Sequence, residues 1–215
     1  MNKVIPTVFA YDKKEFDAKF KELKKISKEL QIDFMDGQLT ETKGVRLEEI
    51  SKMSGIKAEA HLMVIDPESW IEDLKKKGFK KIMVHYESYQ DIGKLAHVVN
   101  EIKSRKMKAW IVFNPETNFN SIFKTIMRIG EIDGVMLMGV SPGRENQELD
   151  TNVISRIRNI KAEFPKIKIQ VDGGVDDKTI GKLKEAGADI VNSGSYVSHS
   201  GDPKKALGEL KKIFD

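Results

Sequence analysis

The chain has 215 residues, and its 37 Lys and Arg outnumber its 33 Asp and Glu to give a formal net charge of +4. This length suits one domain with a large core, and 40% hydrophobic with 33% charged residues is typical of a globular protein rather than a disordered one. The chain has no run long enough for a membrane span, no signal-peptide layout at its start, and no basic cluster interleaved with aromatic residues. We therefore expect a cytoplasmic protein that binds neither membrane nor nucleic acid. The absence of cysteine excludes disulfides, thiolate metal ligands and cysteine nucleophiles.

Strand-like apolar segments alternate with amphipathic helix-like segments along the whole chain. The predicted strands lie near 3–8, 30–35, 57–63, 80–86, 107–113, 132–138, 166–172 and 188–193, and the predicted helices near 13–29, 46–54, 67–77, 89–105, 118–129, 150–163, 176–186 and 203–214. Strict alternation predicts a parallel sheet with right-handed crossovers, and eight units predict a single (β/α)8 TIM barrel over residues 1–215. The alternative, a doubly wound open sheet, is disfavoured because no glycine-rich nucleotide motif follows the first strand.

Three of the predicted strands carry polar residues on one face, although strands of such a barrel are buried on both. The shared faces hold Gln31, Asp33 and Met35 in one strand, Glu59, His61 and Met63 in the next, and Gln170 and Asp172 in the seventh. A buried carboxylate is costly unless it is paired, hydrogen-bonded or bound to a metal. Each residue alone could be an isolated polar group that caps its strand. Together, near the carboxyl ends of their strands, they predict one site that binds a divalent ion or performs acid–base chemistry.

Two glycine-containing turns follow the seventh and eighth strands. The sequence VDGGV at 171–175 leads into a helix, and NSGS at 192–195 comes before another helical start. Glycines at these two places, with backbone N–H groups free at the helix starts, predict a phosphate site. Its residues are Gly173, Gly174, Gly194 and Ser195. The alternative is a pair of ordinary tight turns.

Short motifs occur in a fixed order along essentially the whole chain. They are Pro6-Thr7, IDFMDG at 32–37, HLM at 61–63, VHYE at 84–87, NP at 114–115, MGVSPG at 138–143, VDGG at 171–174 and GS at 194–195. This order resembles the ribulose-phosphate 3-epimerase family. The resemblance implies an isomerase of the pentose phosphate pathway that interconverts D-ribulose 5-phosphate and D-xylulose 5-phosphate through an enediolate. A divalent metal would stabilise the charge of that enediolate.

The resemblance also implies roles for individual residues. Asp33 and Asp172 would be the two acid–base groups on opposite faces of the intermediate, and with His61 they would bind the metal. Thr7, Met35, Met63 and Met138 would contact the substrate, although methionines also serve simply to fill cores. Gly143, in the loop after the sixth strand, would join the phosphate-binding glycines. Relatives of this kind are often homo-oligomers, and a dimer is the state we expect first.

The sequence departs from the family pattern at one predicted metal ligand and in two loops. Gln31 stands where the family has a second metal-binding histidine, so we expect weaker zinc binding and a preference among Zn, Mn, Fe and Mg that moves toward the harder ions. Gln31 could instead hydrogen-bond the substrate with no metal present. The loops at 38–43 and 144–146 also differ; Arg144 would contact phosphate or pair with Glu145 or Glu148.

Three alternative functions remain. A divergent barrel could bind a sugar phosphate without epimerase activity, or it could epimerise a different ketose phosphate. A lyase or decarboxylase is disfavoured because no lysine stands at the end of the second or third strand. We interpret His85 as a core histidine.

Overall fold

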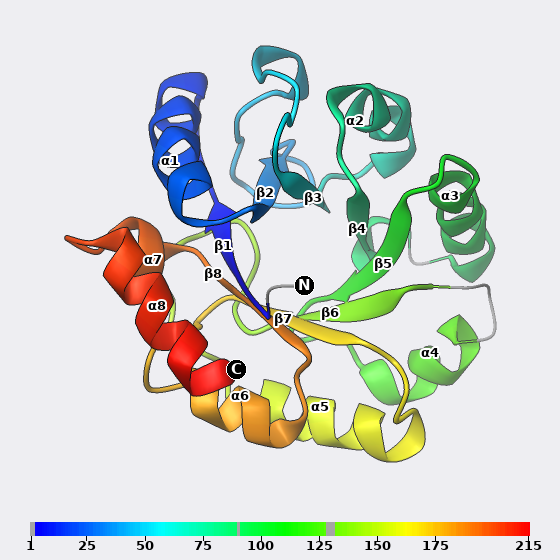
Figure 1. The fold of residues 1–215 in the computed structure, drawn as a ribbon. Helices are drawn as coiled ribbons and strands as arrows, with labels where there is room; N and C mark the ends of the chain where they lie inside the picture. Colours follow the sequence, from blue (N-terminus) through cyan, green and yellow to red (C-terminus); the bar gives the residue numbers. More distant parts are fainter. Residues whose placement is uncertain (1–2, 90, 128–131) are drawn as a thin grey trace.

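A computed structural model describes residues 3–89, 91–127 and 132–215 of the chain. Within these residues eight parallel strands pair in sequence order, and the last pairs with the first to close a barrel (Figure 1). The strands are β1 (Val4–Val8), β2 (Glu29–Met35), β3 (Lys57–Met63), β4 (Lys81–His85), β5 (Lys108–Phe113), β6 (Gly134–Met138), β7 (Ile169–Asp172) and β8 (Ile190–Ser193). The predicted (β/α)8 TIM barrel is confirmed.

Helices surround the barrel and cover the outer face of its sheet (Figure 1). They are α1 (Lys13–Ile26), α2 (Ile71–Lys77), α3 (Ile92–Ser104), α4 (Phe119–Ile126), α5 (Asn152–Glu163), α6 (Ile180–Ala186), α7 (Ser195–Ser198) and α8 (Pro203–Phe214), with short 3₁₀ turns at Leu47–Glu49, Pro67–Trp70 and Tyr86–Ser88. Outward strand residues such as Ile32 and Phe34 pack under these helices in the main core. Burial on both faces explains the near-continuous apolar strands. No helix in the described ranges is long and apolar enough to cross a membrane.

The predicted helix at 46–54 is wrong except for one 3₁₀ turn, Leu47–Glu49. Its apolar residues are buried as a helix stripe would be, but the backbone turns extended at Ile50. The segment gains its hydrogen bonds from α2 instead: the Met53 N–H donates to the Lys77 carbonyl at 2.8 Å, and the Lys77 ammonium donates to the Ile50 carbonyl. The end of α2 thus provides hydrogen-bond partners for backbone groups that would otherwise pair within a local helix.

The structure contains one helix that was not predicted as a separate element, the short helix α7 after β8. The helices predicted at 89–105 and 118–129 correspond to α3 and α4, and positions 90, 128 and 129 of those predictions lie outside the described residues.

The register of the sheet determines which side chains meet at the carboxyl end of the barrel. Asp33 lies opposite His61 across the β2–β3 ladder, and Asp172 lies opposite Met138 across the β6–β7 ladder. Thr7 lies opposite Gln31. Because all eight strands are parallel, the residues at their carboxyl ends converge on one mouth.

Candidate active site

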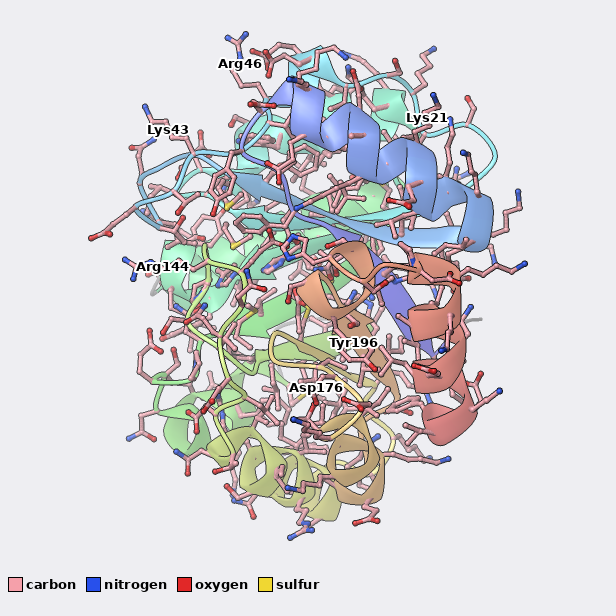
Figure 2. The ribbon with its side chains drawn as sticks, turned by 90° about the vertical axis from the view of Figure 1, so that its left-hand side faces the viewer. Lys21, Lys43, Arg46, Arg144, Asp176 and Tyr196 are labelled. Atoms are coloured by element: carbon pink, nitrogen blue, oxygen red, sulfur yellow. The ribbon has the colours of Figure 1, made fainter. Side chains whose placement is uncertain are left out.

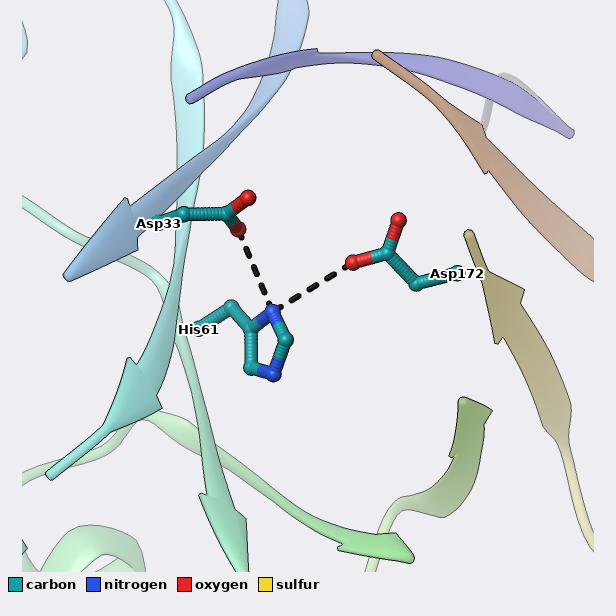
Figure 3. A group of neighbouring side chains, drawn as sticks. All are labelled: Asp33, His61 and Asp172. Atoms are coloured by element: carbon teal, nitrogen blue, oxygen red, sulfur yellow. Dashed lines mark hydrogen bonds and ion pairs between the residues drawn. The ribbon is translucent and has the colours of Figure 1, made fainter. Parts of the chain in front are cut away.

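Asp33, His61 and Asp172 meet in a buried cluster at the mouth of the barrel (Figure 3). The Nδ1 atom of His61 lies 3.1 Å from Oδ1 of Asp33 and 3.3 Å from Oδ2 of Asp172. One potential ligand atom from each residue falls within 4.8 Å of the others. The predicted convergence of β2, β3 and β7 at one site is therefore present in the fold.

Gln31 lies beside this cluster and is fully buried. Its side-chain amide nitrogen donates to Oδ1 of Asp33 at 2.9 Å and to Oδ2 of Asp172 at 2.6 Å. Its oxygen faces away, toward the Gln170 amide at 3.4 Å. Lys81 explains this orientation: its ammonium, which can only donate, bonds the Gln170 oxygen and so turns the Gln170 NH₂ toward Gln31. The amide of Gln31 thus presents donors, not a ligand oxygen, to the carboxylates.

A second buried polar cluster lies below the first, inside the barrel. Lys81 and Glu59 form an ion pair at 2.8 Å, and the Lys81 ammonium sits 3.7 Å from the centre of the Trp110 ring. The Gln170 amide donates to Glu59 at 2.9 Å and also to Asn192. Here one carboxylate meets one ammonium, and the amides complete the hydrogen bonding.

Sequence reasoning missed a chain of groups behind His61. The His61 and His85 rings stack at 5.0 Å, with their Nε2 atoms 2.8 Å apart. The His85 Nδ1 lies 3.3 Å from Glu87, which in turn accepts the backbone N–H of Asn114 at 3.0 Å and the hydroxyl of Thr117. His85 is therefore more than a core histidine, because it fixes the ring of His61. The VHYE motif was the available signal for this pair.

The protonation of the cluster follows from burial and from its neighbours. Burial alone would lower the pKa of His61, but its hydrogen bonds to Asp172 and Asp33 outweigh burial and raise it to about 9. Burial raises the pKa of Asp33 to about 6. Burial lowers the pKa of His85, so His85 is the neutral ring. His61 then donates from both nitrogens, to the carboxylates and to His85, and His85 donates from Nδ1 to Glu87.

The pocket above the cluster contains most of the predicted site residues. It is lined by Thr7, Asp33, His61, Met63, Met138, Gly143, Asp172, Gly173, Gly174, Gly194 and Ser195. Met35 lies outside this lining and packs with Phe9, Met63 and Leu39, which is core packing. Gln31 lies under the pocket floor rather than in its wall. The cavity volume is about 70 Å³, enough for roughly five to seven waters at ~10–15 Å³ each.

The loops at 38–43 and 144–146, which depart from the family pattern, meet over this pocket. The Thr42 hydroxyl donates to the Gly143 carbonyl at 2.7 Å, and Arg144 pairs with Glu41 at 3.0 Å. Figure 2 shows Lys43 and Arg144 at the same end of the barrel, with their side chains directed outward. Arg144 thus forms a surface ion pair, with Glu41 as its partner rather than Glu145 or Glu148.

A closed (β/α)8 barrel with two carboxylates and an imidazole at its mouth defines an enzyme of the acid–base or metal-assisted class. The family model described as the ribulose-phosphate 3 epimerase family matches residues 3–198. The chain belongs to this family and is a ribulose-phosphate 3-epimerase-like isomerase, which confirms the resemblance found in the motifs.

Individual relatives with similar sequences are named as enzymes of the same family. The chain is 33% identical to the ribulose-phosphate 3-epimerase of Helicobacter pylori strain J99, over 98% of this chain and 97% of that protein. It is 29% identical to the Bacillus subtilis enzyme of that name, over 98% and 99%. The match to the Candida glabrata enzyme, 30% identical, spans 72% of this chain and 60% of that protein.

Solved structures with low sequence identity support the fold. A 3-hexulose-6-phosphate synthase from Salmonella typhimurium superposes with a TM-score of 0.76 at 14% identity, covering 99% of this chain and 98% of that one. KGPDC from Streptococcus mutans gives a TM-score of 0.72 at 10% identity, covering 100% of both chains. At such identities the likeness concerns architecture alone.

Proposed function

We propose that this enzyme interconverts D-ribulose 5-phosphate and D-xylulose 5-phosphate by moving the proton at C3 between two carboxylates. The observation that carries the proposal is the placement of Asp33 and Asp172, which flank the same N–H of His61 and border the same pocket. Inversion at C3 needs one group to remove the proton and another to return a proton to the opposite face of the planar enediolate. Two carboxylates on separate strands supply such a pair.

The surroundings of the carboxylates suit this chemistry. A catalytic base works best when its pKa is near the working pH, and burial raises the pKa of Asp33 to about 6. His61 and Gln31 each donate to both Asp33 and Asp172, so they hold the carboxylates in fixed orientations. Met63 and Met138 give the pocket apolar walls that exclude water from the reacting carbon.

A divalent metal fits three of these residues. Asp33, His61 and Asp172 offer two oxygens and one nitrogen close together in a buried site, a donor set suited to Zn, Mn, Fe or Mg. When bound, the metal would stabilise negative charge on the enediolate oxygens. Uptake would require His61 to release its Nδ1 proton, so one cation would replace one proton between the same carboxylates. Gln31 would hold those carboxylates through its NH₂ rather than ligate the ion.

The phosphate of the substrate would lie at the opposite end of the pocket, against Gly143, Gly173, Gly174, Gly194 and Ser195. Three of these glycines, Gly143, Gly173 and Gly174, have positive φ angles of 89°, 96° and 67°. Residues with a side chain rarely adopt this backbone conformation, so the N–H groups here point in directions that other residues rarely allow. Between the two ends, the hydroxyl oxygen of Thr7 is buried and has no hydrogen-bond partner in the described part of the chain. A substrate hydroxyl would supply that partner.

We also make proposals about the cellular setting and the assembly of the protein. We propose a cytoplasmic enzyme, in line with the absence of cysteine and with a rice relative whose name states a cytoplasmic isoform. A homo-oligomer, with a dimer expected first, and a single domain over residues 1–215 stay predictions.

The test is proton NMR of ribulose 5-phosphate in deuterated buffer, with chelator-stripped protein and then with zinc, manganese, iron or magnesium added. We expect deuterium at C3 together with xylulose 5-phosphate, and loss of both in Asp33→Asn and in Asp172→Asn. Asp17→Asn is a matched control, because Asp17 is an exposed carboxylate of α1. The absence of exchange with every metal would reject this substrate.

Two alternatives predict other outcomes. A barrel that only binds the sugar phosphate would be stabilised against heat by ribulose 5-phosphate without incorporating deuterium. An epimerase for a different ketose phosphate would incorporate deuterium at C3 of that sugar instead.

A further inference from the structure

Glu145 places a carboxylate inside the pocket where the phosphate is expected. It stands in the altered loop after β6, yet only 12% of its side-chain surface is exposed, and it lines the same pocket as Gly174, Gly194 and Ser195. A Cβ built on Gly194 would lie 4.0 Å from the Oε1 atom of Glu145. That oxygen is buried without a hydrogen-bond partner among the residues described. A buried carboxylate oxygen in this state is unfavourable.

The other carboxylate oxygen is held by a lysine from α1, the helix that follows β1. The ammonium of Lys19, on α1, lies 3.1 Å from Oε2 of Glu145, 2.8 Å from Glu15 and 2.9 Å from the Phe9 carbonyl. His199, on the loop after α7, lies 3.7 Å from the same Oε2. Burial lowers the pKa of Lys19, but Glu15 and Glu145 outweigh burial and raise it above its ordinary value, so Lys19 is charged.

These contacts point to competition between two anions. A phosphate seated against Gly194 and Ser195 would meet the Glu145 carboxylate at close range, and two anions that are partly shielded from solvent repel each other. Glu145 and its loop neighbours Arg144 and Asn146 also line this pocket, so the loop occupies space beside the expected phosphate position. One of the two anions must leave when the other enters.

We propose that Glu145 occupies the phosphate end of the pocket as an internal anion, that the phosphate of the substrate displaces it, and that Lys19 then binds that phosphate. This inference rests on the proposed function for the nature of the substrate. It makes Glu145 and Lys19 determinants of specificity, because a ligand without an anionic group cannot replace the carboxylate and take over the ammonium. The opening of the loop and the entry of the substrate become one event.

The competing explanation is that the Glu145–Lys19 pair merely fastens the loop to α1. The two explanations predict opposite effects of Glu145→Gln, which keeps the shape of the side chain and removes its charge. Displacement of an anion becomes unnecessary in this variant, so phosphate binding should tighten. A fastening role predicts unchanged or weaker binding, because a loosened loop orders the pocket less well.

The experiment is calorimetric titration of the wild type and variants with inorganic phosphate, with circular dichroism to verify folding. We expect Glu145→Gln to bind phosphate at least several-fold more tightly and Lys19→Met at least tenfold more weakly. Matched controls are Glu148→Gln in the same loop and Lys21→Met on the same helix, both at exposed positions, which should leave the affinity unchanged. If Lys19→Met does not fold, the sign of the change in Glu145→Gln still decides.

Unchanged or weaker binding by Glu145→Gln would overturn the proposal, as would the absence of phosphate binding by both wild type and variant. The titration needs no turnover, so it stands apart from the epimerase assay: tighter phosphate binding without deuterium exchange would reject the reaction while keeping the displacement.

Discussion

The mouth and the base of this barrel each bury a polar cluster, but only one of the two clusters is balanced in charge. At the base one carboxylate, Glu59, meets one ammonium, Lys81. At the mouth Asp33 and Asp172 share a single imidazole, His61, so a negative charge remains even when that ring is protonated. The amides of Gln170 and Gln31 connect the two levels.

The difference shows which buried polar groups serve the fold and which serve a ligand. Both clusters cost desolvation, and a buried group is tolerated when its partners are complete. The base completes its own set from this chain alone. The mouth does not, and the surplus charge there favours a metal ion or the transfer of a proton. Incomplete pairing in a rigid barrel thus marks the active end of the molecule.

The largest effect should come from removing a carboxylate at the mouth. We expect Asp172→Asn to lower kcat by roughly 10²–10⁴-fold, the usual contribution of an acid–base group. Stability should not fall, because the change removes one of two repelling carboxylates. Deuterium exchange at C3 measures the first effect and urea unfolding the second. Retention of more than about a tenth of the activity would contradict the role of Asp172.

The matching change at the base should affect stability instead. Lys81→Met leaves Glu59 buried without its cation, and breaking a buried pair in this way costs about 3–5 kcal/mol of unfolding free energy. Adding Glu59→Gln should recover part of the loss, because the orphaned charge disappears. Urea unfolding of the wild type, the single variant and the double variant gives the comparison. A loss below about 1 kcal/mol in the single variant would place Lys81 among the weak surface pairs.

The position of a site residue could be predicted from the sequence where it depends only on the alternation of strand side chains and on the parallel order of the strands. Asp33, His61 and Asp172 could be placed at one mouth because their faces and strand ends follow from a period of two. Met35 has the same periodicity, yet it packs with Phe9, Met63 and Leu39 instead of lining the pocket. Periodicity gives the face of a residue, not what covers it.

Contacts between distant segments explain what the sequence did not predict. The orientation of the Gln31 amide depends on Lys81 through Gln170, and residues 31 and 170 are 139 positions apart. Glu145 meets Lys19 across 126 positions. No local pattern encodes such pairs. The prediction of a helix at 46–54 was wrong for a related reason: backbone groups of this segment form hydrogen bonds with α2 instead of with one another.

A third prediction concerns the link between the two clusters. Gln31→His should increase metal affinity, because imidazole offers a ligand nitrogen where the wild type presents an amide NH₂. Outer partners of metal sites already change affinity by roughly 10–100-fold, so a direct ligand should gain at least that much for zinc. Competition with a chromophoric chelator measures the affinity without any turnover. Gln31→Glu is a useful control, since it adds a ligand oxygen of similar shape together with a third negative charge. Equal zinc affinity in wild type and Gln31→His would show that residue 31 does not reach the ion.

The smallest effect should come from a partly exposed carboxylate at the outer rim of the base, where Asp189 pairs with Lys161 and Lys168 at 2.6 Å each and accepts the Ile169 N–H at 3.0 Å. Burial raises the pKa of Asp189, but the two lysines and the backbone donor outweigh burial and lower it below its ordinary value. A carboxyl with a lowered folded-state pKa stabilises the fold above its unfolded pKa, and this contribution is lost as the pH falls through the folded value. Because the group is partly exposed, we expect Asp189→Asn to cost under about 1 kcal/mol at pH 7. Urea unfolding of both proteins at several pH values should show this difference shrinking below about pH 4. A difference that grew on acidification would mean that burial, rather than the lysines, dominates at the rim, as it does for Asp33 at the mouth.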